Sequence, residues 1–101
     1  MPSYVVLINY TDQGMRNVRD TVQRYESVRV IGEKLGIAVR EWIWTLGPYN
    51  AIAIIEAADD ATVSRFILFI GSRGNVRTVT TRAYNKDEMA DILRGVPSTV
   101  G

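Results

Sequence analysis

The sequence predicts an α+β fold: a four-stranded antiparallel sheet with two long helices on one face and a short helix added at the C-terminal end. Two segments rich in aromatic and β-branched residues, 39–45 and 50–57, flank a Gly47-Pro48 pair, which is typical of a hairpin turn. Strand-like segments also lie near both ends of the chain, with helical periodicity between them. The resulting order, β-α-β-β-α-β plus a helix, is the split βαβ arrangement.

The first strand is expected over residues 4–10, which are apolar on both alternating faces, as in a strand that is covered above and below. Thr11 or Asp12 can then cap a helix. We predict that helix over residues 15–35, because apolar residues recur there at steps of three and four. Gly36 can end it in the left-handed conformation.

The second helix is expected after the hairpin, with Asp59 as its N-cap and Gly71 at its end. The residues predicted to be buried on it are Val63, Phe66, Ile67 and Ile70. Residues 71–75 form a glycine-containing loop that either holds an anion through backbone amides and Arg73 or only connects helix to strand. The loop lacks P-loop spacing, which favours the connection.

The fourth strand is expected over residues 75–84 and at a sheet edge, because Thr and Arg make it more polar than the first and third strands. Asn85 and Glu88 have the spacing of a capping box, which predicts a short third helix. Its residues Met89, Ile92 and Leu93 are expected to face inward. We predict one domain over residues 1–96 and a flexible tail over 97–101.

The first and third strands are the apolar ones, which places them in the middle of the sheet. Both are apolar on their two faces, yet the two long helices of this arrangement cover only one face. The second face therefore needs a cover that a single chain lacks. We predict self-association, as a homodimer or a higher oligomer, through packing of sheet against sheet.

Composition excludes several classes of function. Twelve basic and 11 acidic residues are interleaved along the chain and give a net charge of +1, so no charged surface for nucleic acid or a membrane is expected. The chain has no cysteine and no histidine, which removes disulfides, thiolate nucleophiles and the commonest ligands of zinc and haem. No metal or cofactor is expected, and without a signal peptide or membrane span we expect a cytoplasmic protein.

Two tryptophans on the hairpin form a candidate pocket wall. Hairpin pairing predicts Trp44 beside Ala51 and Trp42 beside Ala53, so that large side chains stand over small ones. Two indoles above alanines can form one wall of a pocket for a small apolar or aromatic ligand. The alternative is packing in the core or at a subunit interface.

Other candidate ligand-binding residues are Tyr49 and Asn50 beside the turn and Asn9 at the end of a central strand. For all three, a local structural role is the alternative, because Asn near a turn often bonds nearby backbone groups. Glu56 ends the third strand, where desolvation can raise a carboxyl pKa and create a general base. Its alternatives are a solvated position or pairing with Arg40 or Arg77.

Three segments, residues 4–14, 45–50 and 74–78, together resemble the GYD domain family of small prokaryotic proteins. The resemblance extends over nearly the whole chain. It implies a ferredoxin-like protomer that dimerises into an α+β barrel. The wider group includes cofactor-independent monooxygenases, isomerases, haem enzymes and ligand-sensing domains. Haem binding through histidine, found in some of them, is impossible for this chain.

The chain departs from the family signature at the hairpin turn. Pro48 lies between Gly47 and Tyr49, and Asn50 stands where the signature ends in Asp. An amide neither titrates nor supplies negative charge, so Asn50 cannot act as a catalytic acid, although it can serve a turn.

Three functional hypotheses follow. The first, which we adopt, is a homo-oligomeric binding protein with a small, mostly apolar pocket between sheet and helices. The second is a cofactor-independent enzyme of monooxygenase or isomerase type, with Tyr49, Trp44 and Asn9 orienting the substrate. The third is a structural or regulatory oligomer without a ligand, in which the side of the sheet that carries Trp42 and Trp44 is sealed.

Overall fold

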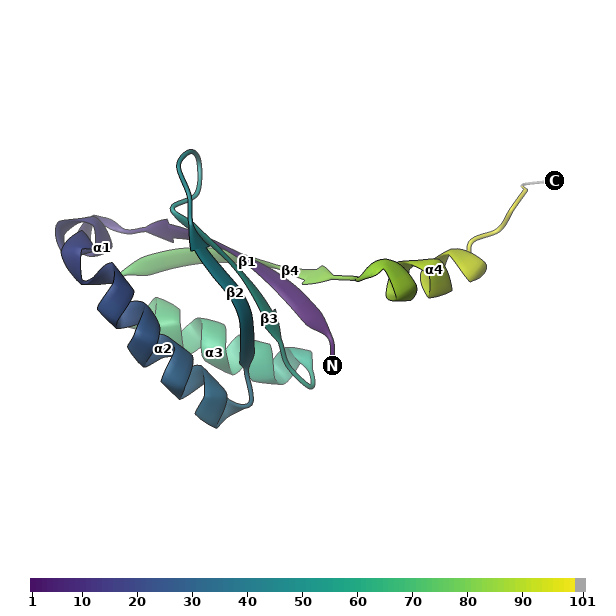
Figure 1. Ribbon diagram of the computed structural model, residues 1–101, viewed down its shortest axis with the longest axis horizontal. Coiled ribbons are helices and arrows are strands. Elements are labelled where there is room, and N and C mark those ends of the chain that lie inside the picture. Colours follow the sequence, from purple (N-terminus) through teal and green to yellow (C-terminus); the bar gives the residue numbers. More distant parts are fainter. Residues whose placement is uncertain (100–101) are drawn as a thin grey trace.

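The computed structural model describes residues 1–99 and has the predicted α+β architecture, a ferredoxin-like fold with an added helix (Figure 1). The sheet is antiparallel, with strand order β2-β3-β1-β4, so the two apolar strands are central as predicted. Of the predicted tail 97–101, residues 100 and 101 lie outside the described residues. The elements are β1 (Ser3–Tyr10), α1 (Asp12–Arg16), a 3-10 turn (Val18–Asp20), α2 (Thr21–Leu35), β2 (Ala38–Trp44), β3 (Ala51–Glu56), α3 (Asp60–Ser72), β4 (Val76–Ala83) and α4 (Lys86–Arg94).

Helices α2 and α3 cover one face of the sheet, and the core lies between them and the central strands (Figure 1). Every second residue of β1 and β3 points into this core, as the period of a strand requires. Phe66 of α3 is 1% exposed and is the largest fully buried side chain. The predicted inward residues Val63 and Ile70 are buried beside it, and Ile67 is partly buried.

The single helix predicted over residues 15–35 is wrong at its N-terminal end. The chain forms α1 first, capped by the Thr11 side chain, which accepts from the backbone N–H of Gly14. Thr11 also binds the loop before β4, because its backbone N–H donates to the Asn75 carbonyl at 3.1 Å. Fixed at that loop, α1 ends at Asn17, and the chain changes direction before α2 crosses the sheet (Figure 1).

The hairpin register is the predicted one, with Trp44 opposite Ala51 and Trp42 opposite Ala53. A β-bulge between Val39 and Glu41 shifts the register nearer the start of β2. After the bulge, Trp42 and Trp44 pair with the core residues Ala53 and Ala51, so both indoles point to the face that α2 and α3 cover.

The opposite face of the sheet, called the open face below, has no helix over it within the described part of the chain (Figure 1). Ile43 is 51% and Val79 is 52% exposed there. Strand pairing brings together the apolar residues of this face, which are Val5, Leu7, Ile43, Ile52, Ile54 and Val79. The apolar second face expected from the sequence is therefore present and uncovered.

The inward orientation predicted for Met89, Ile92 and Leu93 is wrong, because all three side chains are exposed. Helix α4 continues outward from the end of β4 and lies beyond the sheet, and within residues 1–99 no other helix or strand covers its apolar side (Figure 1). The radius of gyration is 16.0 Å, against about 13 Å for a compact chain of this length. The capping box itself formed as predicted between Asn85 and Glu88.

Candidate functional site

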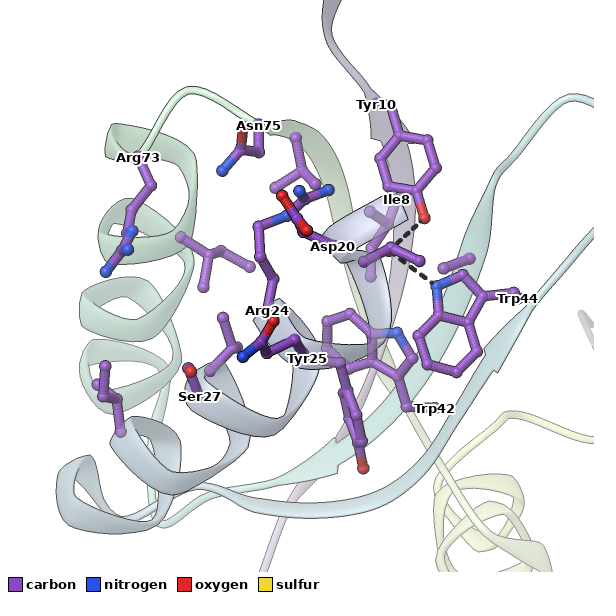
Figure 2. A pocket seen from close by; sticks show the side chains of 17 residues that line it. Ile8, Tyr10, Asp20, Arg24, Tyr25, Ser27, Trp42, Trp44, Arg73 and Asn75 are labelled. Atoms are coloured by element: carbon purple, nitrogen blue, oxygen red, sulfur yellow. Dashed lines mark hydrogen bonds between the residues drawn. The ribbon is translucent and has the colours of Figure 1, made fainter. Parts of the chain in front are cut away.

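A cavity of about 390 Å³ lies between the helix-covered face of the sheet and helices α2 and α3 (Figure 2). We call it the aromatic pocket. Its size falls within the range of about 300–1,000 Å³ that is usual for small-molecule sites. The residues that determine its chemistry are Tyr10, Thr21, Arg24, Tyr25, Trp42 and Trp44.

The wall of the aromatic pocket is a cluster of three rings. Tyr25 of α2 packs against Trp42 with ring centroids 5.0 Å apart and against Trp44 at 5.7 Å, the second pair edge to face. The strand neighbours of the two indoles are Ala53 and Ala51, whose small side chains do not fill the space above the sheet. The space above the small side chain of Ala51, beside the rings of Trp42 and Trp44, therefore belongs to the cavity.

The hydroxyl of Thr21 joins two aromatic side chains at one side of the pocket (Figure 2). It lies 2.6 Å from the hydroxyl of Tyr10 and accepts a hydrogen bond from Nε1 of Trp44 at 3.2 Å. Strand β1, helix α2 and strand β2 are thus held together at this point. These bonds fix the orientation of Trp44 before any ligand enters.

Arg24 brings a positive charge to the aromatic pocket. Its Nη1 donates to the backbone carbonyl of Asn17 at 2.7 Å. Its Nη2 is buried and has no hydrogen-bond partner among the described residues, and the same holds for Nε1 of Trp42. Asp20 and Arg73 also line the cavity. Two of the side chains that line the pocket therefore carry buried hydrogen-bond donors that lack acceptors among the described residues.

Of the predicted site residues, Trp42 and Trp44 line the aromatic pocket. Asn9 instead alternates with the core residues of β1 and lies on the open face, opposite Arg77. Tyr49 is in the hairpin loop, where its carbonyl accepts from the hydroxyl of Thr45 at 2.7 Å. The structure does not bring these side chains together, and ligand binding by them stays a prediction.

Asn50 braces the hairpin loop against the end of β1. Its Oδ1 accepts from the backbone N–H of Tyr10 at 2.9 Å, and its own backbone N–H donates to the Ile8 carbonyl at 2.9 Å. This is the local structural role that the sequence left open for an asparagine beside a turn. It positions Tyr10, one of the residues that line the pocket.

Glu56 and the loop at residues 71–75 have the structural roles that the sequence offered as alternatives to a functional site. Glu56 is paired with Arg40, with Oε1 2.7 Å from Nη2 of the guanidinium. The loop at residues 71–75 connects α3 to β4, and Nε2 of Gln13 donates to the carbonyl of Arg73 at 3.1 Å. Thr11 donates its hydroxyl proton to the carbonyl of Gly74 at 2.6 Å. These carbonyls hold the loop to the start of α1.

Sequence reasoning did not name Thr21, Arg24 or Tyr25 as candidate site residues. The available signal was spacing, because Thr21 and Tyr25 are four residues apart and so lie on one side of a helix. That side faces the tryptophans in α2, a helix that begins after the chain changes direction at Asn17. The predicted continuous helix had no such change of direction.

A hydrogen bond at the other end of β1 shifts the ionisation of a tyrosine. Tyr4 donates a hydrogen bond to Oδ1 of Asp60, and this bond raises the pKa of the phenol.

Among residues 1–99, no three Asp or Glu side chains gather as a metal site requires, and none of the helices is long and apolar enough to cross a bilayer.

Comparison with known proteins gives two matches. The family model described as GYD domain matches residues 4–93. A curated relative from Thermus thermophilus, named glutamine synthetase and cystathionine beta-lyase binding protein, is 37% identical over 84 residues. The aligned part covers 82% of this chain and 88% of that relative. No solved structure matches the chain.

Proposed function

The chain belongs to the GYD domain family, and from this premise we propose that it is a homo-oligomeric binding protein that takes a small molecule into the aromatic pocket. The observation that carries the proposal is the open cavity beside Tyr25, Trp42 and Trp44. A purely structural role for the tryptophans predicts that this side of the sheet is sealed. A cavity of about 390 Å³ there favours a ligand instead.

Fluorescence titration with phenylacetamide and calorimetric titration with indole, which itself emits where tryptophan does, test the pocket with two neutral aromatic probes. We expect saturable quenching of tryptophan emission in the unchanged protein. In Trp44→Ala, the remaining Trp42 reports binding, and the affinity should fall about tenfold or more, because a ring contact and its buried area are lost.

Tyr84→Ala is the matched control, since it removes an exposed aromatic side chain that does not line the cavity. Equal affinities of Trp44→Ala and the unchanged protein would contradict the role given to the wall. A flat response to both probes in the unchanged protein would contradict the pocket itself.

The catalytic hypothesis receives less support from the geometry. It relied on Tyr49, Trp44 and Asn9 to orient a substrate, and only Trp44 lines the aromatic pocket. Asn9 lies on the other side of the sheet, and Tyr49 lies in the hairpin loop. A catalytic site built from these three side chains would need them around one reacting centre.

We also propose that the chain binds other proteins. The relative from Thermus thermophilus carries the name of a protein that binds two enzymes, and the sequence match covers most of both chains. Leu46 at the tip of the hairpin loop is fully exposed, which offers an apolar contact outside the pocket. Purified glutamine synthetase and cystathionine beta-lyase, passed over the immobilised chain, test this: binding of neither enzyme would contradict the proposal for these partners.

Self-association through the open face is the remaining part of the proposal. Six apolar residues form a continuous surface there, and packing against a second sheet would remove them from water. Native mass spectrometry at several protein concentrations tests it. An even-numbered oligomer is expected, whereas a monomer at every concentration would contradict it.

A further inference from the structure

We infer that the aromatic pocket selects a small carboxylate with a flat apolar body, and that Arg24 binds the carboxyl group. The inference rests on the small-molecule function proposed above and adds the chemical class of the ligand. Two buried donors without acceptors among the described residues, on side chains that line one largely apolar cavity, and an excess of positive charge around that cavity carry it.

The guanidinium of Arg24 is only partly satisfied. Nη1 binds the Asn17 carbonyl, while Nη2 is shielded from water and has no acceptor among the described residues. A buried donor without a partner is costly, and more so when it is charged. Figure 2 places the Arg24 side chain across the middle of the pocket, so an acceptor brought by a ligand could satisfy it.

The charge around the pocket is unbalanced. Arg24 and Arg73 line it with a single carboxylate, Asp20, and neither arginine forms an ion pair within residues 1–99. A monoanionic ligand would therefore meet a net positive charge inside an apolar wall, where its attraction to Arg24 is screened less than in water.

Trp42, which also lines the cavity, carries a second buried donor, Nε1, that has no acceptor among the described residues. By contrast, Nε1 of Trp44 already donates to Thr21. Two separate donors fit the two oxygens of a carboxylate, whereas a phosphate brings a further oxygen and up to one more negative charge. The rings of Tyr25 and Trp42 provide an apolar surface for the rest of the ligand.

Binding includes a rotation of the Arg24 side chain, because Nη2 does not touch the cavity surface in the unliganded pocket. Its long, flexible stem permits this movement without a change in α2.

The test compares phenylacetate with its neutral isostere phenylacetamide, and with phenyl phosphate, by calorimetric titration of the full chain at constant ionic strength. Phenylacetate should bind about tenfold tighter than the amide, the difference expected when one charged hydrogen bond is added. Arg24→Met should remove that preference, so that the acid and the amide bind this variant with equal affinity. Arg19→Met, an exposed arginine that does not line the cavity, is the control and should keep the preference.

The outcomes separate this inference from the pocket function. If the amide binds as tightly as the acid, or if Arg24→Met keeps the preference, the carboxylate assignment is overturned while the pocket stands. Tighter binding of phenyl phosphate than of phenylacetate overturns the choice of carboxylate over phosphate. If none of the probes binds the unchanged protein, both the inference and the pocket function are overturned. Thermal unfolding of each variant verifies that it is folded.

Discussion

Replacement of Gly14 by alanine is expected to lower the free energy of unfolding by about 3 kcal/mol, which is a large part of the stability of a small domain. A Cβ at Gly14 would lie 2.0 Å from the backbone oxygen of Asn75. Backbone atoms cannot rotate away as a side chain can. The same oxygen accepts from the Thr11 N–H, so the contact that holds α1 to the loop before β4 would also be disturbed.

Gly71→Ala is the matched control. Gly71 lies inside α3, and a Cβ there would meet nothing within 4 Å. Alanine is favoured over glycine in a helix, so this variant should gain about 0.5–1 kcal/mol. Urea unfolding followed by circular dichroism measures both. If Gly14→Ala is as stable as the unchanged protein, the close packing of α1 on the 74–75 loop is wrong.

Ile54→Lys is expected to weaken self-association about a hundredfold, because it places a charge in the middle of the open face. Ile54 belongs to the central strand β3, and its neighbours across the strands are Val5 and Glu41. The new ammonium group would lie opposite the Glu41 carboxylate, so the fold of the single chain should be kept. Analytical ultracentrifugation over a concentration series measures the dissociation constant.

The control for the open face is Leu68→Lys. Leu68 is also apolar and is 72% exposed, but it lies on α3, on the other side of the sheet. It should leave the association unchanged. Equal weakening by both variants, or an unaffected assembly in Ile54→Lys, would show that the oligomer uses a different surface.

The parts of the fold that depend on local chemistry could be predicted from the sequence. The hairpin register follows from alternating side chains on both sides of one turn, so the pairing of Trp42 with Ala53 was predictable. The caps at Asp59 and Asn85 likewise depend on residues within one helical turn. The central position of β1 and β3 followed from their apolar character.

Features that depend on distant contacts could not be predicted. The break at Asn17 arises because Thr11 and Gly14 contact the 74–75 loop, some 60 residues further along the chain. Arg24, which lines the pocket, donates to the carbonyl of Asn17 at this break. The expectation that α4 packs inward rested on its apolar stripe alone. Such a stripe indicates that one side of the helix favours burial, but it does not identify the surface that buries it.

Helix α4 also has a consequence for the folding of the chain. It has nine residues, whereas an isolated helix shorter than about 12–15 residues is only marginally stable in water. Its capping box and the ion pair between Arg82 and Glu88 stabilise the first turn, whereas Met89, Ile92 and Leu93 in the following turns are exposed. The backbone amides of α4 should therefore exchange with solvent much faster than those of β1 and β3 while the chain is alone, and slow down when a partner covers Met89 and Ile92. Folding of α4 would then be linked to assembly, so that hydrogen exchange in this one segment reports the fraction of chains that are bound.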